Sequence, residues 1–179
     1  KKSSQTVYFM GEEGKDIISV YGVEFKEGKM NLLTSPEIEE KHKIMFKARQ
    51  NAIKQIKNGC FSNYNTIVID DEKSYLVYIL GATTKANTMV FGIHYKAKMS
   101  KKNGSLLMFD PLAKSCLSME VKKDAIPVVT HLINETPIET HVFLSLSHKL
   151  PLYVGTNTGA FKIENGKIEF MGELNCDKK

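Results

Sequence analysis

The dominant pattern along the chain is an alternation of apolar and polar residues with the period of a β-strand. Residues 16–33, DIISVYGVEFKEGKMNLL, combine this alternation with β-branched and aromatic residues around the turn KEGK. Shorter runs follow, and Asn165-Gly166 fits a hairpin turn near the end. The pattern predicts a mainly antiparallel sheet. The other predicted strands are 7–10, 65–70, 75–80, 89–99, 105–109, 126–133 (for which a short helix is the alternative), 151–156, 159–164 and 167–172.

One segment near the start of the chain carries the signals of a long helix instead. Thr34 or Ser35 is the expected N-cap, Pro36 fits the first turn, acidic residues follow, and Gly59 comes after the last turn. The sequence therefore predicts a helix at about residues 36–58.

A second, shorter helix is predicted at about residues 137–149. Thr136 is the expected N-cap, Pro137 takes the first helical position, and Glu139 completes a capping box. Its apolar stripe is predicted to be Ile138, Val142 and Leu146.

Strand runs with two separate helices predict an α+β fold with a mainly antiparallel sheet. The chain has 179 residues, of which 42% are hydrophobic, so it can bury a core without metal or disulfide support. No linker or low-complexity block divides it, and residues 1–179 are predicted to form a single domain. No apolar run reaches the eighteen or so residues of a membrane span.

The formal net charge is +5, and a basic balance can indicate a nucleic-acid partner. Of the 25 lysines and arginines, however, Arg49 is the only arginine. Surfaces that read bases and clamp phosphates usually rely on arginine. We therefore expect no nucleic-acid partner.

Arg49 falls on the apolar side of the predicted long helix, with His42 close to it. One interpretation is a site for a ligand anion made by Arg49 and His42. The other, which we favour because a buried arginine usually has an internal partner, is a structural salt bridge. Its candidate partners are Asp70, Asp71 and Asp110.

The stretch THLINETPIETHVF, residues 130–143, carries two histidines and two glutamates. His131, Glu135 and His141 are candidate metal ligands, although the spacing differs from the i, i+4 pair of HExxH. His141 and Ser145 are candidate catalytic residues, but Ser145 lacks the GxSxG context. The favoured interpretation is a helix start with surface or core histidines, without metal or cofactor.

The three cysteines Cys60, Cys116 and Cys176 show no CxxC spacing, which argues against a zinc site. A disulfide between Cys60 and Cys116 fits an oxidising compartment, and three free thiols are the alternative. The chain begins KKSSQTVYF without a methionine. We expect that a leader has been removed from an exported precursor.

Three stretches of the second half carry a resemblance: FDPLAKSC, VTHLINETPIETHVFLSLSHKLPLYVGT and GAFKIENGKIEF. Together they resemble a group of poorly characterised exported bacterial α/β proteins. The resemblance covers about residues 92–170 and implies a periplasmic or lipoprotein-like domain with no activity attached. The matching positions are Pro137, Glu139, His141, Val142, Phe143, Tyr153, Val154 and Thr156.

These observations favour an exported, non-catalytic protein of the bacterial envelope, such as an immunity or accessory factor. Its expected partner is another protein, bound through sheet edges and the lysine-rich hairpin at residues 94–104. The alternative is a small hydrolase or metal-dependent enzyme centred on His131, His141 and Ser145.

Overall fold

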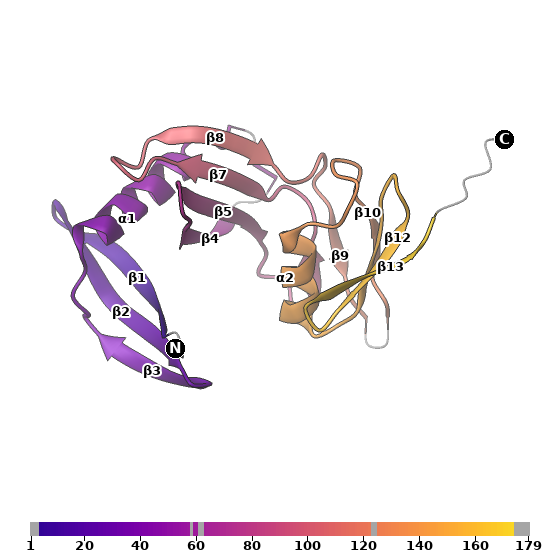
Figure 1. The fold of residues 1–179 in the computed structure, drawn as a ribbon, viewed down its shortest axis with the longest axis horizontal. Helices are drawn as coiled ribbons and strands as arrows, with labels where there is room; N and C mark the ends of the chain where they lie inside the picture. Colours follow the sequence, from indigo (N-terminus) through magenta and orange to yellow (C-terminus); the bar gives the residue numbers. More distant parts are fainter. Residues whose placement is uncertain (1–3, 58, 61–62, 123–124, 174–179) are drawn as a thin grey trace. The chain divides into compact units, whose positions relative to one another are not determined.

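The fold is taken from a computed structural model, which describes residues 4–57, 59–60, 63–122 and 125–173 (Figure 1). The described residues form two helices and four mostly antiparallel sheets, which confirms the predicted α+β class. The elements are β1 (Gln5–Glu13), β2 (Asp16–Lys26), β3 (Lys29–Thr34), α1 (Glu40–Ile53), β4 (Asn63–Asp70), β5 (Tyr75–Ala82), β6 (Thr88–Val90), β7 (Tyr95–Met99), β8 (Leu106–Pro111), β9 (Ser118–Glu120), β10 (Val128–Thr130), α2 (Glu139–His148), β11 (Leu152–Gly155), β12 (Ala160–Glu164) and β13 (Lys167–Gly172).

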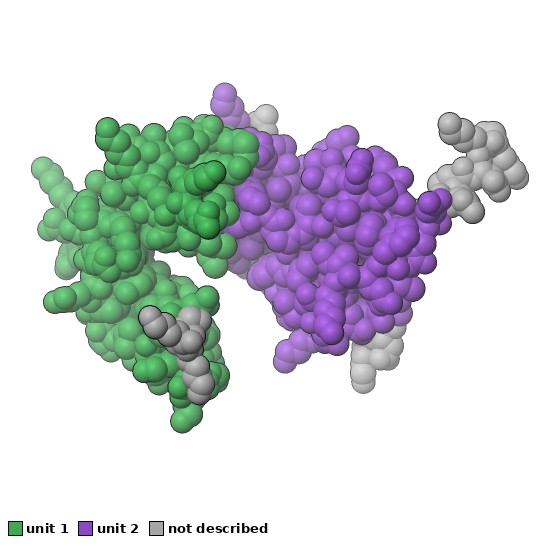
Figure 2. All heavy atoms as spheres, in the orientation of Figure 1, with its two compact units in different colours: residues 1–55, 67–77, 97–108 green, residues 56–66, 78–96, 109–179 purple. Residues whose placement is uncertain are grey.

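The chain forms two compact units, which Figure 2 shows in different colours. Unit 1 consists of residues 1–55, 67–77 and 97–108. Unit 2 consists of residues 56–66, 78–96 and 109–179. The sheet of β4, β5, β7 and β8 takes residues from both sets of ranges. Single-domain folding of residues 1–179 stays a prediction.

Unit 1 contains a three-stranded sheet of order β1-β2-β3, in which both strand pairs are antiparallel. The β2–β3 hairpin closes through the two residues Glu27 and Gly28, whose φ angles are 53° and 76°. Two positive φ angles define a type I′ turn, which matches the twist of the strands that it joins.

Helix α1 also belongs to unit 1, and it is shorter than the predicted helix at 36–58. Its N-cap is Glu39, because His42 at the third helical position accepts the Glu39 backbone N–H at Nδ1 (2.9 Å). Pro36 instead packs against the sheet at Gly22, so the predicted caps Thr34 and Ser35 are wrong. At the other end, the backbone N–H of Gln55 donates a hydrogen bond to the carbonyl of Ala52 (3.1 Å), which closes the last turn.

The turn after β7 approaches the backbone of α1 very closely. Gly104 has a φ of 69°, and a Cβ on it would lie 2.9 Å from Ala48 N and 3.0 Å from Ile44 O. The Gly104 carbonyl accepts a hydrogen bond from Asn51 Nδ2 on the same helix. Only glycine combines this backbone conformation with this approach.

Unit 2 contains a sheet of order β10-β11-β12-β13 and a two-stranded sheet of β6 and β9. Strand β10 pairs with β11 in parallel, whereas the other pairs of the larger sheet are antiparallel. Helix α2 packs against β12 and β11. The core between them consists of Met89, Phe91, Val129, Leu144, Leu152, Val154 and Ile163.

Helix α2 begins two residues later than predicted and turns a different side inward. Its N-cap is Ile138, so Thr136 is not the cap and Glu139 is the first helical residue. Of the predicted apolar stripe, Leu146 is 52% exposed and was placed wrongly, whereas Val142 is half-buried and packs against the core. Hydrogen bonds made by buried polar side chains fix the inward face, which consists of Thr140, His141, Leu144 and Ser145.

Candidate functional site

The structure brings His131 and His141 of unit 2 together. His131 follows β10, and His141 lies in the first turn of α2. Their rings meet edge to face at 80°, with centroids 4.8 Å apart, and each residue is 5% exposed. The nine residues between them reverse the chain direction, which the spacing of the two histidines did not reveal.

Hydrogen bonds and burial hold His141 in its neutral form. Its Nδ1 accepts the backbone N–H of Ile138 (3.1 Å), so the ring proton is on Nε2. Burial, reinforced by the nearby His131 and His94, lowers the pKa of His141 to about 4. His131 Nε2 lies 3.1 Å from Asn134 Oδ1, which can accept its proton.

A third buried histidine, His94, was not identified from the sequence. It follows a break between β6 and β7, where Ile93 adopts a φ of 50°. Its Nδ1 accepts the Gly81 N–H (3.0 Å), and its Nε2–H donates to the Val90 carbonyl (2.9 Å). Burial lowers the pKa of His94. With both nitrogens engaged in backbone bonds, His94 is a structural residue.

The histidine pair borders a small pocket of about 120 Å³. Lys114 also lines it, and its other walls include Phe91, Leu117 and Val129. Glu135, the third candidate metal ligand, has an exposed side chain, and its carbonyl accepts the hydroxyl of Thr156 (2.8 Å). Among the described residues no three His, Cys, Asp or Glu side chains are placed to hold one metal ion.

Ser145 is buried in α2, and backbone carbonyls occupy its hydroxyl. Its Oγ lies 2.7 Å from Leu150 O and 3.1 Å from Ile163 O, both of which can only accept its proton. A serine nucleophile needs a base that accepts this proton. The arrangement therefore ties α2 to β12 and does not activate Ser145.

An ion pair flanks the start of α2. Glu139 Oε1 accepts hydrogen bonds from Lys96 Nζ (2.6 Å) and from the hydroxyl of Tyr78. Burial by itself raises the pKa of Glu139, but these hydrogen bonds outweigh it and lower the pKa to about 2. Glu139 is therefore a fixed negative charge at a helix N-terminus, where such a charge is stabilising.

His42, the predicted companion of Arg49, also has a structural role in unit 1. Besides capping α1, its ring lies against Tyr8, with centroids 4.4 Å apart. Burial, followed by the charge of Lys41, lowers the pKa of His42. Arg49 is half-buried and lies two turns further along the same side of α1, and its predicted role stays a prediction.

Cys60 and Cys116, which the sequence suggested as a pair, are joined by a disulfide with Cα atoms 5.8 Å apart. The third cysteine, Cys176, lies outside the described residues. Helices in the described ranges are too short or too polar to cross a membrane. A disulfide is consistent with an oxidising compartment.

The sheet of unit 1 carries a feature that the sequence analysis missed, an exposed apolar face. Residues paired directly across antiparallel strands point to the same side, and side chains alternate along each strand. The register pairs Val7 with Val23 and Val23 with Leu32, which fixes the members of the face. The apolar face consists of Val7, Phe9, Tyr21, Val23, Phe25, Met30 and Leu32.

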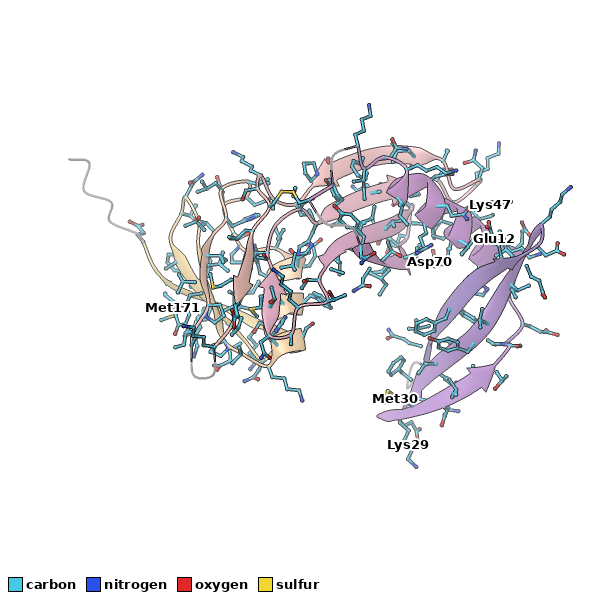
Figure 3. The ribbon with its side chains drawn as sticks, turned by 180° about the vertical axis from the view of Figure 1, so that it is seen from behind. Glu12, Lys29, Met30, Lys47, Asp70 and Met171 are labelled. Atoms are coloured by element: carbon cyan, nitrogen blue, oxygen red, sulfur yellow. A yellow bond between two sulfur atoms is a disulfide. The ribbon has the colours of Figure 1, made fainter. Side chains whose placement is uncertain are left out.

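Six of these seven side chains are between 39% and 72% exposed, and Val23 is half-buried. Met30, labelled in Figure 3 beside Lys29 at the start of β3, is among the most exposed. The opposite side of the sheet packs on Pro36 and His42. Alternation in three successive strands was a signal of the face, but it could not show that these side chains are exposed.

Comparisons with protein-family models, curated proteins and solved structures found no match to this chain. The resemblance to exported bacterial proteins therefore rests on sequence motifs and stays a prediction.

Proposed function

We propose that this chain is an exported, non-catalytic protein of the bacterial envelope that binds another protein through the apolar face of β1, β2 and β3. The observation that carries the proposal is a group of seven apolar side chains on one side of a sheet, six of them exposed. Exposed patches of this kind mark interaction sites.

The size of the apolar face fits a protein partner. Seven side chains of this size and exposure form a patch of roughly 600 Å², at the upper end of what monomers expose. At about 25 cal/mol per Å², covering it would release on the order of 15 kcal/mol before the costs of association. Association itself costs roughly 4–15 kcal/mol, so the net affinity depends on how closely the partner packs against the face.

Further observations support export and the absence of catalysis. The disulfide between Cys60 and Cys116 suits a protein that matures outside the reducing cytoplasm. The hydroxyl of Ser145 is bonded to carbonyls, and the buried His141 is committed to its helix N-terminus. The roles expected of such a protein are those of an immunity or accessory factor.

The test is a comparison of three variants that place a carboxylate on exposed apolar positions. Val7→Glu and Phe25→Glu change the apolar face, and Val128→Glu is the matched control, because Val128 is 63% exposed on β10. Each tagged protein is cross-linked in envelope fractions of the producing bacterium, and the captured proteins are identified by mass spectrometry. Circular dichroism confirms that each variant is folded.

We expect one partner that is captured by the wild type and by Val128→Glu and is lost from both face variants. Equal capture of every protein by the wild type and by all three variants would contradict the proposal. Secretion of the native precursor, followed by fractionation, tests the envelope location separately.

A further inference from the structure

Strand β3 is an open edge of the three-stranded sheet. It pairs with β2, and among the described residues no other strand pairs with it. Its interior, residues 30–33, contains neither charge nor proline, and its pairing with β2 has no register shift. The opposite edge, β1, has a shift between Phe9 and Met10. Bulges, charges and prolines protect edges against strand addition, so β3 is the unprotected edge.

The hairpin geometry determines which amides of β3 point outward. In a two-residue type I′ hairpin, the residues that flank the turn, here Lys26 and Lys29, exchange hydrogen bonds with each other. Hydrogen-bonded and non-bonded pairs then alternate along the strands. The residues whose N–H and C=O groups point away from β2 are therefore Met30, Leu32 and Thr34.

These outward amides belong to residues whose side chains lie on the same side as the apolar face. A strand added beside β3 would extend that face by its own alternate side chains. Its residues next to Met30 and Leu32 must be apolar, and the intervening ones polar. The edge thus specifies both an extended backbone and an alternating sequence.

Charge specifies one end of the added strand. Lys26 and Lys29 are directly opposite each other across the hairpin, on the side away from the apolar face. Like charges in this position repel. Glu24, on the same side two residues before Lys26, offsets part of the charge of Lys26, and an acidic residue on an added strand would pair with Lys29 at the open edge. The strand that fits β3 therefore carries a carboxylate at the position next to Lys29.

We propose that the partner docks by adding an extended segment to β3, with apolar residues at alternate positions and an acidic residue beside Lys29. This inference rests on the proposed function, because the segment belongs to the protein that covers the apolar face. The six-residue edge is about 20 Å long. If a second copy of the chain joined this one edge to edge through β3, the contact would bury far less surface than the roughly 800 Å² per partner of a standard interface. Such a dimer would therefore be weakly held.

A pair of substitutions at Leu32 tests the strand addition. Leu32→Pro removes one outward N–H and keeps an apolar side chain, and the bonds to β2 do not use this N–H. Leu32→Val keeps the N–H and is the matched control. The probe is a labelled peptide, Asp-Val-Thr-Val-Thr-Val-Asp with capped ends, which places its acids and threonines on the Lys29 side. Binding is measured by fluorescence anisotropy.

We expect the wild type and Leu32→Val to bind this peptide within about threefold of each other. Leu32→Pro should bind at least about tenfold more weakly, the effect of about 1.4 kcal/mol. A peptide with lysine in place of both aspartates should also bind about tenfold more weakly. Equal binding to both variants, or no binding to the wild type at millimolar peptide, would overturn the proposal.

Hydrogen exchange on the wild type provides a test that needs no variant to fold. Saturating peptide should slow exchange at the amides of Met30, Leu32 and Thr34 more than at Asn31 and Leu33, whose amides already face β2. Uniform protection, or none, would also overturn the strand addition.

Capture in envelope fractions separates this inference from the proposed function. If Val7→Glu loses the partner and Leu32→Pro keeps it, the apolar face is the binding site and the added strand is wrong. If both keep it, the proposed function is wrong as well. A concentration-dependent dimer that Leu32→Pro abolishes would assign the edge to a second copy and overturn the partner segment.

Discussion

Protonation of His141 should weaken unit 2 at mildly acidic pH. The Nδ1 that accepts the Ile138 N–H cannot do so once it carries a proton, and the ring is 5% exposed. The titratable groups around it are His131, His94 and Glu139, and burial has the largest effect on its pKa. A charged imidazole would therefore lose its capping bond and remain buried beside two other histidines.

The folded pKa of His141 is about 4, against 6.5 for an ordinary histidine. Because the folded pKa is the lower one, the unfolded chain binds the proton more tightly. This contribution to stability is complete above pH 6.5 and is lost as the pH falls from 6.5 toward 4. Linkage gives a loss of about 2 kcal/mol between pH 7 and pH 5, and about 3 kcal/mol in full.

The assay is urea unfolding of the wild type and His141→Gln at pH 7 and pH 5, followed by far-ultraviolet circular dichroism. Glutamine at the third helical position can accept the N-cap amide but does not titrate. His42 and His94 titrate in both proteins, and Glu139 titrates below this range. We expect the wild type to lose about 2 kcal/mol more than the variant. Equal losses would refute the assignment of a buried neutral cap to His141.

Three further outcomes are expected. Reduction of the Cys60–Cys116 disulfide, which closes a loop of 56 residues, should lower the free energy of unfolding by about 4 kcal/mol, and denatured, unreduced protein should show a single reactive thiol. Gly104→Ala should lower the melting temperature much more than Gly28→Ala, since both have positive φ but only Gly104 touches a helix backbone; similar shifts would contradict this packing. Ser145→Ala should cost about 1–3 kcal/mol in urea unfolding, because buried carbonyls lose their donor.

The secondary structure could be predicted because its signals are local. The alternating run at 16–33 forms two strands of one hairpin, and the class of fold follows from such runs. Helix starts were misplaced for a specific reason. The sequence offered Ser, Thr and Pro as start signals, whereas both helices place a histidine at the third helical position as acceptor for the N-cap amide. A neutral imidazole can fill the place usually given to glutamate or glutamine, and the burial that favours the neutral form here is a tertiary property.

The candidate site was foreseen in part. His131 and His141 were identified, but their ring contact depends on how the chain reverses between β10 and α2. His94 gave no signal, because a lone histidine in a strand run looks the same whether its nitrogens face water or backbone groups. The predicted stripe failed at Leu146, because the buried hydrogen bonds of His141 and Ser145 turn the side of α2 that carries them inward.

The three-stranded sheet of unit 1 explains why binding is a better proposal than catalysis. A sheet normally buries its apolar side against another layer, and here the side that is packed carries the helix start at His42. Twenty-five basic residues are available along the chain, yet none lies among the positions that form the apolar face. One lysine there would make the surface compatible with water at little cost to the fold. An uncharged face beside an unprotected edge therefore supports the proposal that a second molecule binds here, and β3 contributes to both features.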